Sequence, residues 1–161
     1  MEDKALYETQ PSHDIIVCAS RGGEGSRAAL RAATDYARDS NALIRFLYVV
    51  DATQFNDVEP VLRSALLQEL KWAGQTLMEL ASRRGNQAGV TCEVIILKGK
   101  TRDTIITYML EHKAKALFLG APRGTTANIF GDDEIEQFGI EIEKQTKTKV
   151  AIVRPEDVPS H

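Results

Sequence analysis

Short apolar runs alternate with longer amphipathic segments along the whole chain. Five runs are bounded by glycine or polar residues: Ile15 to Ala19, Leu43 to Val50, Val90 to Leu97, Ala116 to Leu119 and Val150 to Val153. Runs of this length without polar alternation predict strands that are buried on both faces. The segments between them carry apolar residues three or four positions apart, which predicts helices. Strict alternation of the two predicts an α/β fold with a five-stranded parallel, doubly wound sheet and helices on both faces.

Several residues predict where the helices begin and end. Ser26 is a candidate N-cap for a helix that runs to about Ser40, and Pro60 suits the first turn of a long second helix. Gly85 is a candidate left-handed cap at the end of that helix. Its predicted inward face consists of Leu62, Leu66, Leu70, Ala73, Leu77 and Leu80. Trp72, in the middle of the same helix, is predicted to be either core or an interface anchor.

Composition narrows the class of protein. A chain of 161 residues with 43% hydrophobic residues and a net charge of −3 predicts a single domain over residues 14–155, with flexible arms at 1–13 and 156–161. The apolar content argues against disorder of the whole chain, and no apolar stretch is long enough for a membrane span. The acidic balance argues against a nucleic-acid partner. Cys18 and Cys92 lie in apolar runs, so we expect reduced cysteines in a cytoplasmic protein.

In a doubly wound sheet, ligands bind beyond the carboxyl ends of the strands, where the winding direction reverses. The loop after the first strand carries Gly22, Gly23 and Gly25 just before a helix, a pattern that favours an anion such as phosphate. It also satisfies a loose dinucleotide fingerprint with Asp51 after the next strand, and it partly resembles the loop of ATP-dependent pyrophosphatases. The alternative interpretation is that the glycines only turn the chain.

The loop after the fourth strand is longer and also rich in glycines and hydroxyls. It begins at Gly120 and extends to Asp132. Its candidate phosphate ligands are Arg123, Gly124, Thr125, Thr126 and Gly131. An arginine and hydroxyl groups in a glycine-bearing loop before a helix can bind phosphate oxygens.

The chain resembles a universal stress protein domain from about Asp14 to Pro155. The resemblance rests on Asp14 to Ser20, on Ser26 to Leu30, on Phe46 to Asp51, on Leu117 to Gly120 and on Val150 to Pro155. It implies a Rossmann-like fold of the adenine nucleotide alpha hydrolase type with strand order 3-2-1-4-5. It also implies a homodimer formed along the fifth strand.

Some members of that family bind ATP through a G-x2-G-x9-G-[ST] motif after the fourth strand. Gly120 occupies the first position, but Gly124 comes one residue late, and Glu136 and Gln137 stand where the final pair is expected. Gly131 is the nearest substitute. At the end of the first strand Ser20 replaces the family's aspartate, whereas Val49 matches the position that lies against adenine. The candidate nucleotide-binding residues are therefore Ser20, Gly22, Gly23, Val49, Gly120, Arg123, Gly124, Thr125, Thr126 and Gly131.

The resemblance implies a cytoplasmic stress-response protein that acts by dimerisation and by binding ATP or AMP with Mg²⁺, without catalysis. No catalytic or metal-binding residue is predicted, because His13, His112 and His161 are scattered along the chain. Two alternatives stay open. The same domain can serve as a nucleotide-independent regulatory module for a transporter or an enzyme partner, or as a nucleotide-dependent enzyme that uses the Gly22 to Ser26 loop.

Overall fold

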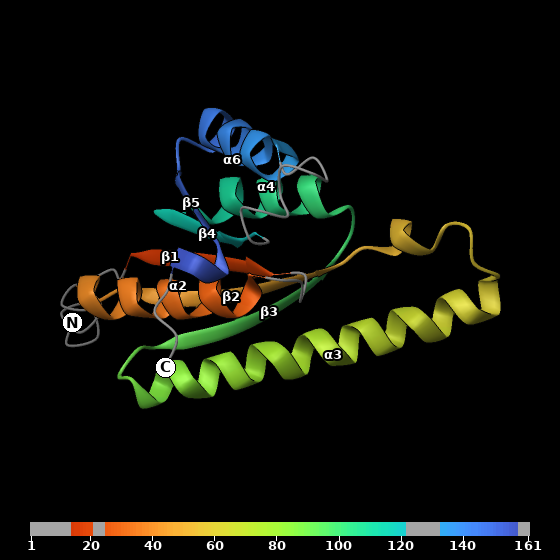
Figure 1. Cartoon of the computed structure of the whole chain (residues 1–161), viewed down its shortest axis with the longest axis horizontal. Helices are drawn as coiled ribbons and strands as arrows, with labels where there is room; N and C mark the ends of the chain where they lie inside the picture. Colours follow the sequence, from red (N-terminus) through yellow and green to blue (C-terminus); the bar gives the residue numbers. More distant parts are fainter. Residues whose placement is uncertain (1–13, 21–24, 122–132, 158–161) are drawn as a thin grey trace, which may run out of the picture.

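A five-stranded parallel sheet forms the centre of the computed structural model, which describes residues 14–20, 25–121 and 133–157 (Figure 1). Its strand order is β3-β2-β1-β4-β5, as the family resemblance implied. The strands are β1 Ile15–Ser20, β2 Leu43–Val50, β3 Cys92–Lys98, β4 Ala116–Gly120 and β5 Lys149–Val153. The helices are α2 Ser26–Ser40, η1 Ala52–Phe55, α3 Pro60–Gln87, α4 Thr101–His112, α6 Asp133–Thr146 and η2 Pro155–Asp157.

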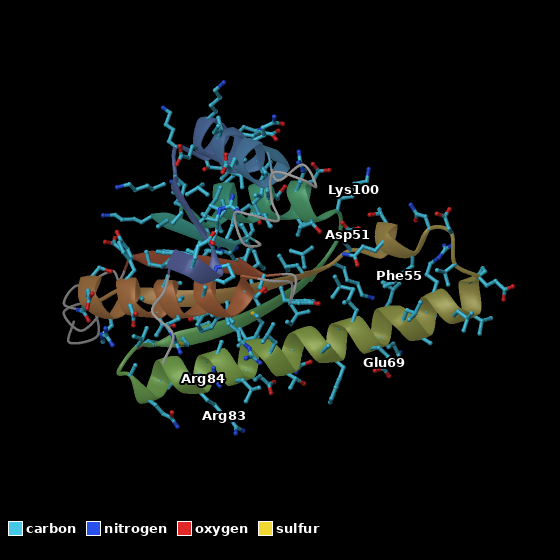
Figure 2. The ribbon with its side chains drawn as sticks, in the orientation of Figure 1. Asp51, Phe55, Glu69, Arg83, Arg84 and Lys100 are labelled. Atoms are coloured by element: carbon cyan, nitrogen blue, oxygen red, sulfur yellow. The ribbon has the colours of Figure 1, made fainter. Side chains whose placement is uncertain are left out.

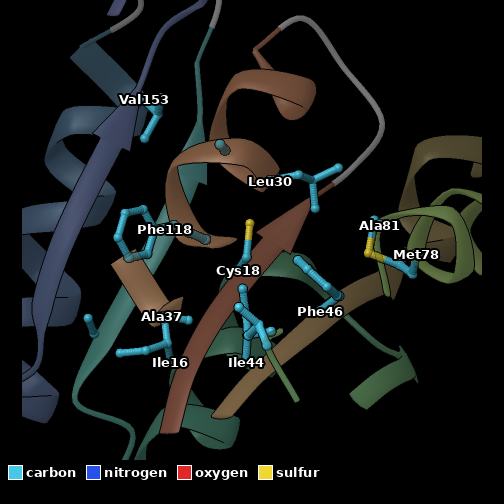
Figure 3. Packing of buried hydrophobic residues seen from close by; sticks show 14 of the residues in the cluster. Ile16, Cys18, Leu30, Ala37, Ile44, Phe46, Met78, Ala81, Phe118 and Val153 are labelled. Atoms are coloured by element: carbon cyan, nitrogen blue, oxygen red, sulfur yellow. The ribbon is translucent and has the colours of Figure 1, made fainter. Parts of the chain in front are cut away.

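Successive side chains of the central strands enter two separate cores, because side chains alternate across a strand. Ile16 and Cys18 of β1 point to the face that α2 and α3 cover, where Phe46 and Met78 are completely buried (Figure 3). Val17 of β1 points to the opposite face, which α4 and α6 cover. The apolar runs of β1, β2 and β4 therefore become strands that are buried on both sides, as predicted. The edge strands β3 and β5 are only partly buried, because each has a neighbouring strand on one side alone.

The helix ends differ in detail from the predictions. Gly25, not Ser26, is the N-cap of α2, and its left-handed backbone (φ 91°) suits glycine. Asn41 ends α2 in the same conformation. Gly85 lies inside α3 rather than at its end. A β-carbon at this position would overlap the sulfur of Cys92, so the glycine allows α3 to pack closely against β3. The left-handed residue that follows α3 is Gly89, with φ 85°.

The predicted inward face of α3 is wrong over most of its length. Leu62, Leu66 and Leu80 are 56%, 39% and 50% exposed. The buried residues of the helix are Gly74, Met78, Ala81 and Gly85. Figure 1 shows the cause for Leu62 and Leu66: the N-terminal part of α3 runs past the end of the sheet together with η1, so no strand lies beneath it. Leu80 lies further along the helix and is exposed although its neighbours Met78 and Ala81 are buried. Trp72 is 67% exposed, which excludes the core interpretation for this residue.

Both cysteines are unpaired thiols. Cys18 is completely buried, and this burial raises the pKa of its thiol to about 12. Burial also raises the pKa of Cys92 to about 11. Because the thiolate is the reactive form, these raised pKa values favour the unreactive protonated thiol at both positions.

Candidate functional site

The loops that follow β1 and β4 meet at the carboxyl edge of the sheet, where the described residues are Gly25, Ser26, Gly120 and Ala121. A β-carbon on Gly120 would lie 2.8 Å from the carbonyl carbon of Gly25, and one on Gly25 would overlap the backbone of Ala121. Two segments of backbone approach this closely only where no side chain lies between them. The winding of the sheet reverses between β1 and β4, so this meeting point is the position at which such folds bind ligands.

The N-terminus of α2 adds hydrogen-bond donors to the same edge. Gly25 caps the helix by its backbone only, and among the described residues no side-chain capping hydrogen bond to the first turn is present. The first intrahelical bond runs from the Ala29 amide to the carbonyl oxygen of Gly25, at 2.9 Å. Uncapped amides at a helix N-terminus carry partial positive charge and favour an anion.

Ser20, Val49 and Gly120 are the predicted site residues that the structure describes. Ser20 and Gly120 are the last residues of β1 and β4, and Val49 is the second-last residue of β2. Pairing of Ala19 with Leu119 brings Ser20 next to Gly120, and pairing of Ser20 with Tyr48 brings it next to Val49. The Ser20 hydroxyl donates a buried 2.8 Å hydrogen bond to the Ser26 hydroxyl. Val49 is 3% exposed and packs in the core beneath α4, so its side chain belongs to the fold.

The remaining predicted site residues lie outside the described part of the chain. They are Gly22, Gly23, Arg123, Gly124, Thr125, Thr126 and Gly131. Their assignment as phosphate ligands stays a prediction.

Asp51 is a buried carboxylate immediately after β2, and hydrogen bonds engage both of its oxygens (Figure 2). Oδ1 accepts from the amide and hydroxyl of Thr53. Oδ2 accepts from the amide of Thr101 at 3.0 Å and from its hydroxyl at 2.9 Å. Burial alone would raise the pKa of Asp51, but these four hydrogen bonds outweigh it and lower the pKa from 3.8 to about 2.

This arrangement gives Asp51 a structural role that the sequence analysis missed. The carboxylate ties the end of β2 to the first residue of α4, fifty positions further on. A dinucleotide-binding acid must instead leave its oxygens available to a ribose. The saturated oxygens of Asp51 therefore argue against the dinucleotide interpretation. The signal in the sequence that could have indicated this contact is an aspartate directly after a strand together with a threonine at the start of a later helix.

Arg154 is a second residue at this edge that the sequence analysis did not single out. It follows Val153, whose carbonyl oxygen accepts a 2.9 Å hydrogen bond from the Ala121 amide, so Arg154 lies beside the loop after β4. Its side chain is 15% exposed, and its Nη2 lies 3.1 Å from Oε1 of Glu136 in α6. The motif comparison expected a small polar pair at Glu136 and Gln137. The structure instead has an ion pair there.

Metal-ligand groups and membrane-spanning helices are both absent from the described residues. No group of three or more histidine, cysteine, aspartate or glutamate residues in ranges 14–20, 25–121 and 133–157 is arranged to hold a metal ion. Within the same ranges, none of the helices combines the length and the apolar character that crossing a membrane requires.

The fold and this edge define a class of protein with a Rossmann-like parallel sheet whose switch point lies between its first and fourth strands. A model of the universal stress protein family matches residues 12–132 of the chain. The chain therefore belongs to the universal stress protein family, as the sequence resemblance predicted. A comparison with curated protein sequences gives no significant match.

Solved structures of the family share this fold at low sequence identity. Universal stress protein UspA from Lactobacillus plantarum is similar with a TM-score of 0.71 and 18% identity, over 90% of this chain and 100% of that one. A universal stress protein family protein from Arabidopsis thaliana, solved with AMP bound, has a TM-score of 0.62 and 18% identity, over 91% and 96%. A universal stress protein in complex with cAMP has a TM-score of 0.59 and 18% identity, over 89% and 98%.

Proposed function

We propose that this chain is a nucleotide-binding universal stress protein that holds an adenine nucleotide, ATP or AMP with Mg²⁺, at the edge between β1 and β4. The observation that carries the proposal is the contact of Gly25 with Gly120 and Ala121 beside the uncapped N-terminus of α2. Amide donors and a close backbone approach together suit a phosphate group. The AMP-bound and cAMP-bound structures of similar fold support an adenine nucleotide as the ligand.

The proposed role is binding and not catalysis, in a cytoplasmic stress response. Three side chains with nucleophilic or acid–base chemistry are engaged in other interactions. The Cys18 thiol is buried with a raised pKa, the Asp51 carboxylate is saturated by hydrogen bonds, and the Ser20 hydroxyl bonds to Ser26. Unpaired cysteines agree with a cytoplasmic location.

The proposal includes a homodimer along β5. This strand is an edge of the sheet, since its one neighbour is β4, and an edge strand offers a row of backbone groups to a second strand. Val150, Ala151 and Ile152 on this edge are only partly buried. A second copy of β5 can therefore pair with it.

Substitutions in the Glu136–Arg154 ion pair test the proposed nucleotide site. Arg154 is the cation beside the β4 loop, and Glu136 competes with a phosphate for it. Arg154→Gln should lower nucleotide affinity about tenfold, as loss of a charge-assisted contact does. Glu136→Gln should raise affinity, because it removes the competing carboxylate. Arg38→Gln, on the exposed surface of α2, is the matched control and should leave affinity unchanged.

Calorimetric titration and thermal unfolding with ATP, AMP and Mg²⁺ provide the measurement. At 1 mM nucleotide and a Kd of ~10 μM, binding stabilises the folded state by about 2.7 kcal/mol, which is a clear rise in melting temperature. Absence of any shift at 1 mM of either nucleotide would refute the proposal. That result would favour the nucleotide-independent regulatory module.

A further inference from the structure

The outward face of α3 carries exposed side chains that have no partner among the residues that the structure describes. Glu69, Ala73, Thr76, Leu80 and Arg83 follow one another at spacings of four and three residues and are all exposed. We call this row the outer seam. Spacings of three and four place residues on one side of a helix, and a seam of this kind is the contact surface of paired helices.

The outer seam combines apolar area with unpaired charges. Trp72 borders it and is 67% exposed, and Leu80 within it is 50% exposed. Glu69, Arg83 and the adjacent Arg84 have no ion pair or side-chain hydrogen bond with any residue in the described ranges (Figure 2). Large exposed apolar side chains next to unpaired charges are more typical of an interaction surface than of a helix face that contacts only water.

The order of these residues is self-complementary about Thr76. Glu69 precedes Thr76 by seven positions and Arg83 follows it by seven, whereas Trp72 and Leu80 are each four positions away. If two copies of α3 lie antiparallel with a two-fold axis at Thr76, Glu69 of each copy faces Arg83 and Arg84 of the other. Trp72 of each copy then lies against Leu80 of the other. A two-fold interface requires this kind of match, in which one patch is complementary to itself.

We infer that the outer seam of α3 is a docking surface for a second copy of this chain, paired antiparallel about Thr76. The helix has 28 residues, a length of about 42 Å, so several turns overlap on each side of the axis. A single pair of helices buries an area at the low end for specific interfaces, at or below about 1,200 Å² in total. We therefore expect association in the micromolar range.

This surface is separate from the β5 edge. The α3 helix packs against β2 and β3, and β3 is the edge strand opposite β5 (Figure 1). The two interfaces do not compete. Loss of pairing through α3 therefore halves the number of subunits in the assembly and leaves any dimer formed through β5 intact.

Charge reversal tests the pairing in both directions. Glu69→Arg places like charges against Arg83 and Arg84 of the partner and should weaken association at least tenfold, and the double variant Arg83→Glu with Arg84→Glu should do the same. An equimolar mixture of the two variants should associate as the wild type does, because each reversed charge then meets its opposite. Glu111→Arg and Arg27→Glu change exposed residues of α4 and α2 and serve as controls.

Sedimentation velocity gives the subunit number, and Trp72, the only tryptophan of the chain, reports the interface directly. Its emission should shift to shorter wavelength as wild-type concentration rises and should stay constant in each reversed variant. Circular dichroism of every variant confirms folding. A wild type whose Trp72 emission is unchanged up to 200 μM would overturn the inference, and so would a mixture that fails to regain association. Association that survives both reversals would also overturn it and would assign the oligomer to β5.

Discussion

Gly25 and Gly120 lie so close together that a β-carbon on Gly120 would be 2.8 Å from the carbonyl carbon of Gly25. One residue precedes α2 and the other ends β4, so their contact joins the two halves of the doubly wound sheet at its switch point. The absence of side chains at both positions is what allows the loops to form one site.

Substitution Gly120→Ala should destabilise the fold by about 1–3 kcal/mol, because the added methyl group meets backbone atoms that cannot rotate away. Urea denaturation of both proteins measures the difference in the free energy of unfolding. The control is Gly89→Asn. That position has a positive φ, which asparagine tolerates, and open space around it, so we expect a change below about 1 kcal/mol. Equal losses at the two positions would contradict the steric explanation.

The Asp51 carboxylate should make stability depend on pH at the acidic end. Its pKa is lowered from 3.8 to about 2, so its contribution is fully present above about pH 4 and is lost as pH falls toward 2. A pKa shift of this size corresponds to roughly 2 kcal/mol in the free energy of unfolding. In Asp51→Asn that contribution should be absent at neutral pH, and the difference from wild type should shrink between pH 4 and 2.

Chemical denaturation from pH 2 to 7 checks the effect of Asp51. Asp57→Asn alters an exposed carboxylate that follows η1 and is the matched control, for which we expect a change within about 0.5 kcal/mol. A constant difference between wild type and Asp51→Asn across this pH range would show that the charge of Asp51 does not stabilise the fold.

Arg45 and Glu93 pair across β2 and β3 at 2.9 Å, and the Arg45 side chain is 20% exposed. Its guanidinium also donates to the Tyr108 hydroxyl at 3.3 Å. A double-mutant cycle with Arg45→Met and Glu93→Gln should give a coupling energy of about 0.5–1 kcal/mol, since Glu93 is partly exposed. The same cycle on the exposed pair Lys115 and Asp14 should give less. Equal coupling energies in the two cycles would mean that burial of the Arg45 side chain does not strengthen its ion pair with Glu93.

The two ends of α3 should respond differently to truncation of apolar residues. Met78 is completely buried against the sheet, and Met78→Ala should cost about 2–5 kcal/mol. Leu62 is 56% exposed where the helix extends past the sheet, and Leu62→Ala should change stability by less than about 0.5 kcal/mol. Thermal unfolding of both variants distinguishes the two ends, and a large loss in Leu62→Ala would show that the extension is packed.

The strands were predictable from local patterns, whereas two local cap predictions, Ser26 and Gly85, were wrong. The apolar runs predicted all five strands to within two residues, and α3 begins at Pro60 as expected. The predicted inward face of α3 was wrong, because the spacing of Leu62, Leu66 and Leu80 is helical but the strands end before they reach Leu62 and Leu66. Periodicity identifies an apolar side of a helix, but it does not say what covers that side.

The candidate site divides in the same way. Ser20 and Gly120 were predicted because the family resemblance places nucleotide-binding positions at the ends of the first and fourth strands, and the sheet register does place the two residues on adjacent strands. Asp51 with Thr101, and Arg154 with Glu136, could not be predicted, because each pair joins residues that are distant in the sequence. Such contacts depend on the register of the strands and on where each helix begins.

The order of strands and helices along the chain was determined by the sequence itself, because hydrophobic period acts over a few residues, and the family resemblance implied the strand order and with it the switch point. Tertiary structure decided which of the apolar residues of α3 are buried and which carboxylates are paired. The physical reason is that burial and pairing require a second surface, and only the folded sheet brings distant segments close enough to provide it.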